Sequence, residues 1–373
     1  MVTIPRQMTA SAGTTFAFAD LEAAVYPTSV PNGLAEEIDH LYSSLFTTTD
    51  WFVSHDDAKP TGACVLAQPR HVLLFYVKGD TVEVLNKAFE IAPQDARRAC
   101  TALFRAIPQA RRIHLEVMFP PAELRLPLRT RYVTDHMMID LPDTVDAYYA
   151  SLGRSMRRNL RRARNHLRRD HPDTATAIVV PGDNGSELLE EFLQWKRARF
   201  REKGRTTYWD DNPDLVKRFV ELLRRRGEAH IMTIEGRRAA INFVFPVGDT
   251  VCAQESSFDP RYERAELGLL SQYEVVTNAV ERGAARMNLL WGSASHKHHF
   301  GAVAHRAAAL SVFRDQTARL WSLDEAAGVA RRRLRRAAHS YYWKTRHAAG
   351  DAGRALRRRA ARGGGGRDAV TSR

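Results

Sequence analysis

The sequence predicts an α/β (α+β) fold built from two similar domains and a basic C-terminal tail. Alternating apolar and polar runs rich in β-branched residues predict short strands, and runs with apolar residues three and four positions apart predict helices. The same order, antiparallel strands followed by one crossover helix and a returning strand, occurs in both halves of the 373 residues. The chain is 44% hydrophobic and 27% charged, which is typical of globular domains and excludes a wholly disordered protein.

The first half is expected to contain a short helix, three antiparallel strands, a long helix and two further strands. Pro93 suits the first turn of the long helix, because an N–H would have no partner there. The expected ranges are a helix at 34–46, strands at 62–66, 71–76 and 82–91, a helix at 94–107, and strands at 112–118 and 136–141.

The second half repeats this order with longer elements. Ser186 is expected to cap one helix and Asn212-Pro213 to open the next. Glu235-Gly236 and Gly248-Asp249 are typical of hairpin turns, and Gly283 of a helix C-terminus. The expected ranges are a strand at 175–180, helices at 187–201 and 214–225, strands at 229–235, 238–247 and 250–258, a helix at 267–282, a strand at 286–291, a turn with Lys297, and a last strand at 307–314.

Positive charge is concentrated in two segments. The net charge is +13, and residues 325–373 hold 14 Lys and Arg against three acidic residues, so residues 1–324 are nearly neutral. Residues 154–169 hold eight arginines and no acid. The arginine faces of this predicted helix either are solvated, as charged runs usually are, or bind a polyanion. The second alternative arises because eight uncompensated arginines repel one another unless an anion lies beside them. Its apolar side is a single stripe able to dock on a domain, made of Leu152, Met156, Leu160, Ala163 and Leu167.

The tail is basic and carries a small aromatic group. Residues 326–362 are rich in Ala, Arg and Leu and include Tyr341, Tyr342 and Trp343. Such a segment can contact an anionic membrane peripherally, with nucleic acid as a less favoured partner and no partner as the remaining alternative. No apolar run reaches the length of a membrane span, and the N-terminus lacks a secretory pattern. We therefore expect a cytoplasmic protein, which the tail can bring to the inner face of the cytoplasmic membrane.

The cysteines and histidines do not predict a metal centre. The three cysteines are odd in number and far apart without CxxC spacing, which excludes a disulfide framework and a zinc ribbon. The cluster of His296, His298 and His299 has no matched carboxylate or distant histidine pair, so no metal is expected.

An anion site is expected after the strand at 250–258. Gly268 opens the helix that follows this strand. Free N–H groups at a helix start, helped by the helix dipole, bind anions, and this suits a pyrophosphate. The alternative is that Gly268 only allows the helix to pack closely on the strand.

Several segments together match one known family. They are 152–160, Trp195-Lys196-Arg197-Ala198-Arg199-Phe200 with Gly204, 236–245, Ser257-Phe258-Asp259-Pro260, Tyr262, Gly268, Gly283, Trp291-Gly292 and Lys297. In this order they resemble the GNAT acyltransferase superfamily, and within it the CelD/BcsL-like family with a BioF2-like acetyltransferase domain, related to the FemAB transferases. The resemblance covers 140–315 well and 15–140 only weakly. It implies a degenerate N-terminal GNAT-like domain (1–145), an acyl-CoA-binding GNAT domain (146–320) and a tail (321–373), each domain a mixed, mostly antiparallel sheet flanked by helices.

The resemblance also implies where the co-substrate lies. In that family, acetyl-CoA or another acyl-CoA binds between two strands that splay apart. This places pantetheine beside 251–258 and pyrophosphate near 265–269, with contacts from Ser256, Ser257, Phe258, Arg264, Gly268 and Leu269. Two positions depart from the pattern: Leu270 replaces the final Gly or Ala of the phosphate loop, and Asn288 stands where Asp is common.

Acyl transfer to an amine or hydroxyl needs a base, donors for the oxyanion and an acid or solvent path for the thiolate. Glu255 is the preferred base, with a strand ion pair as the alternative role, and Tyr262 and His298 are further catalytic candidates. The expected acceptor-side contacts are Trp195, Arg199, Trp291 and Lys297. For Trp195 the alternative is a position in the core, which is the more common role of such a residue.

The expected function is acyl-CoA-dependent N- or O-acyl transfer, such as acetyl transfer, to a cell-envelope polysaccharide or lipid-linked precursor. One alternative follows the FemAB kinship, namely transfer from aminoacyl-tRNA, although the long helical hairpin common in those proteins is not found in the sequence. The other alternative is a non-catalytic GNAT-like module that binds polyanions.

Overall fold

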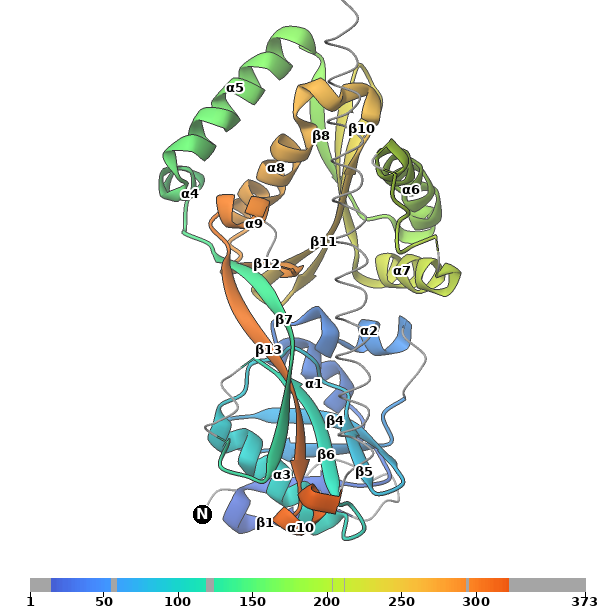
Figure 1. Cartoon of the computed structure of the whole chain (residues 1–373), viewed down its shortest axis with the longest axis vertical. Coiled ribbons are helices and arrows are strands. Elements are labelled where there is room, and N and C mark those ends of the chain that lie inside the picture. The colour runs from blue at the N-terminus through green and yellow to red at the C-terminus, as the bar shows by residue number, and fades with distance from the viewer. Residues whose placement is uncertain are drawn as a thin grey trace, which may run out of the picture. The chain divides into compact units, whose positions relative to one another are not determined.

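The structure is a computed structural model that describes residues 15–54, 59–118, 124–202, 204–210, 212–292 and 295–321. The chain divides into two compact units, residues 1–315 and residues 316–373. All the described strands belong to the first unit (Figure 1), and the described part of the second is helix α10 (Gln316–Trp321). The predicted basic helix at 326–362 lies outside the described residues.

The described strands form one mixed sheet of thirteen strands in the order β1-β2-β3-β4-β5-β6-β13-β7-β12-β11-β10-β9-β8. Their bounds are β1 (Phe16–Phe18), β2 (Ala23–Tyr26), β3 (Gly62–Leu66), β4 (His71–Lys78), β5 (Thr81–Val84), β6 (Arg112–Val117), β7 (Leu128–Asp140), β8 (Thr174–Val179), β9 (Glu228–Ile234), β10 (Arg237–Val247), β11 (Thr250–Phe258), β12 (Arg286–Trp291) and β13 (Val303–Phe313).

The two halves of the sheet follow one plan. The N-terminal half runs β2, α1 (Leu34–Leu41), α2 (Thr49–Ser54), β3, β4, β5, α3 (Pro93–Ala106) and β6. The C-terminal half runs β8, α6 (Gly185–Glu202), α7 (Pro213–Arg226), β9, β10, β11, α8 (Leu267–Glu281) and β12. In each half the strand before the long helix pairs in parallel with the strand after it, β5 with β6 and β11 with β12. The α/β fold class and the repeated order of elements that the sequence predicts are confirmed.

The last strand of each half completes the other half. After β6 the chain enters β7, which pairs with β12 of the C-terminal half, and after β12 it enters β13, which pairs with β6. Strands β7 and β13 also pair with each other along most of their length and so join the two halves. Because β7 and β13 are exchanged between the two halves in this way, neither half forms a separate sheet. The domain boundaries expected at residues 145 and 320 remain predictions.

Helices cover both faces of the C-terminal half of the sheet (Figure 1). Helices α6 and α7 pack on one face, where the core includes Phe192, Phe219 and Phe243. Helix α8 packs on the opposite face, with α4 (Val145–Ser151) and α5 (Arg154–Asp170) outside it. The predicted apolar stripe of the arginine segment is buried in that second core, so α5 docks as expected and turns its arginines outward.

Some predicted boundaries are wrong. The strand predicted at 82–91 ends at Val84, because the following segment turns away from the ladder. Ser186 does not cap its helix, since α6 already begins at Gly185. The helix predicted at 34–46 ends at Leu41 and is followed by a separate 3₁₀ turn at Leu45–Thr47. Helix α4 is missing from the prediction, and β7 and β13 are longer than predicted because each spans both halves of the sheet.

Among the described residues, no helix combines the length and the apolar character that a membrane crossing requires.

Candidate active site

Strands β11 and β12 separate from each other in the middle of the C-terminal half. Their parallel pairing covers only Thr250–Cys252 against residues 286–288, although β11 continues to Phe258 and β12 to Trp291. Beyond Cys252 the facing edges of the two strands are therefore not joined by the sheet ladder. This gap is the opening that the family resemblance implies between the splayed strands.

Local irregularities on both strands shape the gap. In β11, Gln254 is an extra residue, because Glu255 lies opposite Phe243 while Ala253 lies opposite Val244. In β12, Leu290 has a positive φ of 56°, and its N–H donates to Asn288 Oδ1 at 2.8 Å instead of to a neighbouring strand. Asn288 is buried, so its side chain satisfies an amide that the departing strand would leave unpaired.

Glu255 lies at this gap within a polar cluster. Its side chain is 9% exposed and is ion-paired through Oε2 with Lys196 of α6, while the Tyr208 hydroxyl donates to Oε1. Burial and the adjacent Glu255 charge raise the pKa of Tyr208 well above its usual value, which keeps the hydroxyl a donor. The strand ion pair considered for Glu255 is present, and the carboxylate also lines both cavities described below.

Lys297 closes the opposite side of the gap. It lies in the short helix α9 (Ser295–His299), and its Nζ donates to the carbonyl oxygens of Leu289 and Trp291, both at 2.7 Å. These carbonyls belong to the part of β12 that has left β11. Burial lowers the pKa of Lys297 below its usual value, and the Glu255 carboxylate opposes this shift.

Two cavities meet at Glu255. One, of about 320 Å³, is bounded by α7, by Trp51 of α2, by the middle of β11 and by the end of β12. The other, of about 220 Å³, is lined by Asn242, Ser256 and Gln272, the last of these from α8. Both are lined by Gln254, Glu255, Leu289 and Lys297, so the gap connects the α7 side of the sheet with the α8 side. One ligand can therefore approach Glu255 from each face.

The start of α8 combines a first turn without acidic residues, preceded by Glu266, with close packing on β11. Its first turn contains Gly268 and no acidic residue. A Cβ at Gly268 would lie 3.1 Å from the Phe258 ring, so glycine is also needed for the close approach of helix and strand. Arg264 is exposed just before the helix and Leu269 is half-buried. Leu270 is 2% exposed in the core beneath α8 and does not line either of the two cavities at Glu255.

Other expected site residues lie in different places. Tyr262 packs its ring edge-on against His171 and lines neither of these cavities. Trp195 of α6 is buried in the core, which fits the structural alternative. The Arg199 guanidinium lies 3.9 Å from the centre of the Phe258 ring, beyond the gap. His298 is exposed, and it is His296 that lines the cavity on the α8 side.

The structure brings together Glu255, Ser256, Trp291 and Lys297 from the expected set, and it adds residues that were not predicted from the sequence. Lys196 was within reach of sequence reasoning, since it lies one turn after the buried Phe192 and next to Trp195. Tyr208 comes from a loop without a periodic pattern, and the adjacent Trp209 is the one sequence signal that could have drawn attention to it. Ser257 is buried opposite Ile241, on the strand face away from Ser256.

Within the described ranges, no group of three or more His, Cys, Asp or Glu side chains is placed to hold a metal ion. Cys64, Cys100 and Cys252 are buried, and burial raises the pKa of each thiol above its usual value.

Comparisons with known proteins bear on the family and the fold. Residues 154–298 match the family model described as an acetyltransferase (GNAT) domain. Comparison with curated protein sequences gives no match. Among solved structures, one titled FemX aligns over 78% of this chain and 98% of its own, with 12% identity and a TM-score of 0.56. A conserved protein of unknown function from Bacteroides thetaiotaomicron aligns over 71% and 88%, with 11% identity and a TM-score of 0.51.

At these identities the likeness to solved structures concerns the fold alone. A tandem GNAT protein from the clavulanic acid biosynthesis pathway aligns less well, over 78% of this chain and 98% of its own, with 9% identity and a TM-score of 0.40. The matched segment 154–298 contains the β11–β12 gap, Glu255 and Lys297. The chain therefore contains a GNAT-type acetyltransferase domain at residues 154–298, within a sheet that repeats one plan twice.

Proposed function

We propose that the protein is an acyl-CoA-dependent acyltransferase whose active site is the gap between β11 and β12. The observation that carries the proposal is that two cavities on opposite faces of the sheet meet at Glu255 and Lys297. Acyl-CoA enters on the α8 side, with its pyrophosphate at the helix start near Gly268 and its pantetheine along Ser256. The acceptor enters on the α7 side. Acetyl-CoA is the simplest co-substrate, and no metal takes part.

The chemical step requires one bond to form and one to break. The acceptor amine or hydroxyl attacks the thioester carbonyl, forming a C–N or C–O bond, while its proton passes to the Glu255 carboxylate. At the Gln254 bulge the main chain departs from regular pairing, so an N–H there can stabilise the oxyanion. The C–S bond then breaks, and the CoA thiolate takes a proton from Lys297, whose pKa is already lowered by burial.

The acceptor proposed from the family resemblance is a cell-envelope polysaccharide or lipid-linked precursor. Residues 326–362 would bring the enzyme to such an acceptor by resting on anionic lipid at the inner face of the cytoplasmic membrane. Deleting this segment should abolish co-sedimentation with phosphatidylglycerol vesicles and leave acyl-CoA binding unchanged. Equal sedimentation of the shortened chain would remove the membrane proposal alone.

Acyl-CoA binding is the first test of the function. A ligand at 100 times its dissociation constant adds about 2.7 kcal/mol to stability, which raises the thermal midpoint by several degrees. Acetyl-CoA should produce this rise in the wild-type protein. Gly268→Glu should prevent it by placing a carboxylate at the anion site and a Cβ against the Phe258 ring, and Arg264→Glu, at an exposed position, should weaken it through charge alone.

Gly153→Glu is the matched control, because Gly153 lies at the start of α5 and a Cβ added there would meet nothing within 4 Å. This variant should respond to acetyl-CoA as the wild type does. The unliganded midpoint of each variant reports any damage to the fold. No rise in the wild type with any acyl-CoA contradicts the function and favours the non-catalytic polyanion-binding module.

A second candidate function, transfer from aminoacyl-tRNA, is favoured by one observation. Helix α5 exposes Arg154, Arg158, Arg161 and Arg168 along one side, and no ion pair involves them among the described residues. Transfer RNA binding should then weaken steeply with salt, and replacing these four arginines by Gln should flatten that dependence. Tight binding of acetyl-CoA together with salt-insensitive, weak RNA binding would exclude this candidate.

A further inference from the structure

The cavity on the α7 side of the gap has aromatic walls. The chain contains six tryptophans, and Trp51, Trp209 and Trp291 all line this one cavity, together with Tyr208 and Phe219. Trp291 is 50% exposed and is stacked on Phe46, with ring centres 5.1 Å apart and planes inclined by 25°. Indole faces of this kind suit a flat ring with an apolar C–H face and polar edges.

The charges at the floor of this cavity argue against a cationic occupant. Glu255 is the carboxylate among the lining residues, and it is already ion-paired with Lys196. Lys297 adds a second ammonium group at the same floor. An ammonium ligand would therefore meet one more cation than anion, and cation–π attraction from the walls would be opposed by this repulsion.

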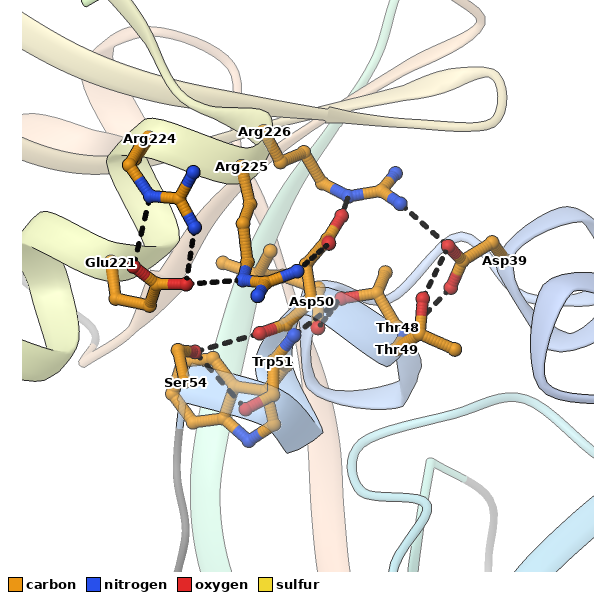
Figure 2. A network of polar contacts seen from close by, with 11 residues as sticks. Asp39, Thr48, Thr49, Asp50, Trp51, Ser54, Glu221, Arg224, Arg225 and Arg226 are labelled. Carbon is orange, nitrogen blue, oxygen red and sulfur yellow. Dashed lines mark hydrogen bonds and ion pairs between the residues drawn. The ribbon is translucent and has the colours of Figure 1, made fainter. Parts of the chain in front are cut away.

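One wall belongs to the N-terminal half of the protein. Trp51 lies on α2, which packs against α7 of the C-terminal half. The neighbouring Asp50 accepts a hydrogen bond from Arg226 Nε at 2.7 Å, and its carboxylate lies 3.9 Å from the Arg225 guanidinium. Asp39 accepts a hydrogen bond from Arg226 Nη2, also at 2.7 Å (Figure 2). The partly buried pairs of Asp50 tie α2 to the end of α7 and so fix the position of Trp51, while the Asp39 pair ties α1 to the same arginine.

Gln254 supplies a polar contact at the same place. Its Oε1 is buried and has no hydrogen-bond partner among the described residues, and Gln254 lines the cavities on both sides of the gap. A buried polar atom without a partner is costly, so it points to a ligand that brings a hydrogen-bonding group. A ring hydroxyl supplies one.

We propose that this cavity binds a neutral sugar ring, that Trp51 from the N-terminal half stacks on it, and that a hydroxyl of the sugar is the group acylated. The inference rests on the proposed function for its chemical step, in which the hydroxyl oxygen forms the ester bond, its proton goes to Glu255 and the CoA thiolate leaves. It assigns the N-terminal half a direct part in acceptor recognition.

The test compares a neutral with a cationic oligosaccharide of equal length, using the full chain. Cellotetraose should quench tryptophan fluorescence and bind, whereas the glucosamine tetramer at pH 6, where its amines are charged, should bind at least tenfold more weakly. Trp51→Ala should weaken cellotetraose binding about tenfold, and Trp51→Phe should restore part of it. Acetyl-CoA affinity, measured separately by calorimetry, should stay within twofold in both variants.

Variants of the ion-pair network supply a matched control. Arg226→Gln, which leaves Trp51 unchanged but loosens α2, should weaken cellotetraose binding severalfold. Arg224→Gln should not, because Arg224 is ion-paired to Glu221 on the same helix. The proposal is overturned if Trp51→Ala leaves sugar affinity unchanged, if the cationic tetramer binds more tightly, or if neither tetramer binds at millimolar concentration. If the wild type does not bind acetyl-CoA, the proposed function is contradicted instead. The sugar titration would still decide the role of Trp51.

Discussion

The parallel pairing covers three residues in both halves, but the strand that begins with Thr81-Val82 ends at Val84, whereas the strand that begins with Thr250-Val251 continues to Phe258 after it has left its parallel partner. Both strands follow a Gly-Asp turn. The carbonyls of Asp80 and Asp249 each accept hydrogen bonds from two amides, those of the first residue of β6 or β12 and of the residue before it. The two halves therefore share the base of the parallel pair and differ in what happens beyond it.

Beyond that base the N-terminal half is closed. Asn86, in the position of Glu255, accepts from Leu74 N–H at 2.9 Å and donates to the Val72 carbonyl at 3.1 Å. Phe89, in the position of Phe258, forms a parallel bridge to Val117 of β6 and is 1% exposed. The side chains that would line an opening are instead part of the core, which supports the interpretation of this half as a degenerate companion.

The two helix starts differ in the same direction. Helix α3 begins with Pro93, which lacks an N–H, and Asp95 in its first turn is buried and ion-paired with Arg98 at 3.0 Å. Helix α8 begins without Pro or an acidic residue in its first turn. The first turn of α3 would therefore repel an anion, whereas the first turn of α8 carries no negative charge and the acidic residue next to it, Glu266, precedes the helix. One plan thus yields a half that is bridged beyond the base of the parallel pair and a half that is open there, and the difference lies in a few residues after each turn.

The largest effect is expected when the residue that replaces Asn86 in the repeated plan is changed. Glu255→Gln should lower the turnover of acetyl-CoA roughly 10²- to 10⁴-fold, because the amide cannot accept the acceptor's proton. The release of the CoA thiol measures this turnover. Acetyl-CoA affinity should change little. Asn86→Ala should leave turnover per folded molecule unchanged and lower stability by about 1–3 kcal/mol through two lost buried hydrogen bonds. Turnover of Glu255→Gln near the wild-type value would show that the comparison misidentifies the base.

Acid should lower the stability of the protein through His136, which lies on β7, one of the two strands that join the halves of the sheet. This residue of β7 is 1% exposed, and burial, with a contribution from Lys297, lowers its pKa to about 4. The unfolded chain binds a proton near pH 6.5, so stability falls as pH drops from about 6.5 towards 4, by up to about 3 kcal/mol. Urea unfolding at pH 7 and 4.5 should show this loss in the wild type and much less in His136→Leu. A similar loss in that variant would place the acid-sensitive group elsewhere.

Asn288 should control the width of the gap. Its position in the register matches His114 of the N-terminal half, which bonds across the closed pair to Glu83 at 2.9 Å. Asn288→Leu removes the acceptor for Leu290 N–H, so β12 should relax towards β11 and acetyl-CoA affinity should fall about tenfold. Asn288→Asp keeps an acceptor and should retain affinity within a few-fold. Equal loss in both variants would mean that the amide itself contacts the ligand.

Sequence patterns predicted the elements well where local chemistry decides them. The strands at 62–66, 250–258 and 286–291 were predicted with their observed bounds, since each is flanked by turn residues and packs in the core. The exchange of β7 and β13 was not predictable from periodicity, because both strands alternate in the same way whichever partner they take. The repeated Gly-Asp-Thr-Val at 79–82 and 248–251 is a further sign of the duplication, beyond the order of elements from which it was predicted.

The site was predictable only in part for a similar reason. Glu255 and Lys297 could be named from the strand and turn that carry them, but their partners come from elements far away in the chain. Lys196 and Tyr208 meet Glu255 only because α6 and the loop after it fold over β11. Trp195 was assigned to the acceptor and belongs to the core, since the burial of a helix face depends on which neighbour covers it.

The smallest effect concerns Glu266, which precedes α8 where the uncharged Ala92 precedes α3. Its carboxylate accepts from Arg162 of α5 at 2.8 Å, with both side chains partly exposed. Because a negative charge at this helix start repels a pyrophosphate, Glu266→Gln should tighten acetyl-CoA binding about two- to fivefold at low salt, and the gain should vanish at high salt. Calorimetry at two salt concentrations measures this, with Glu274→Gln, further along α8, as the control. Weaker binding of acetyl-CoA to Glu266→Gln would mean that the ion pair with Arg162 holds the start of α8 in place. The difference between the starts of α8 and α3 would then lie in how firmly each is held and not in its charge.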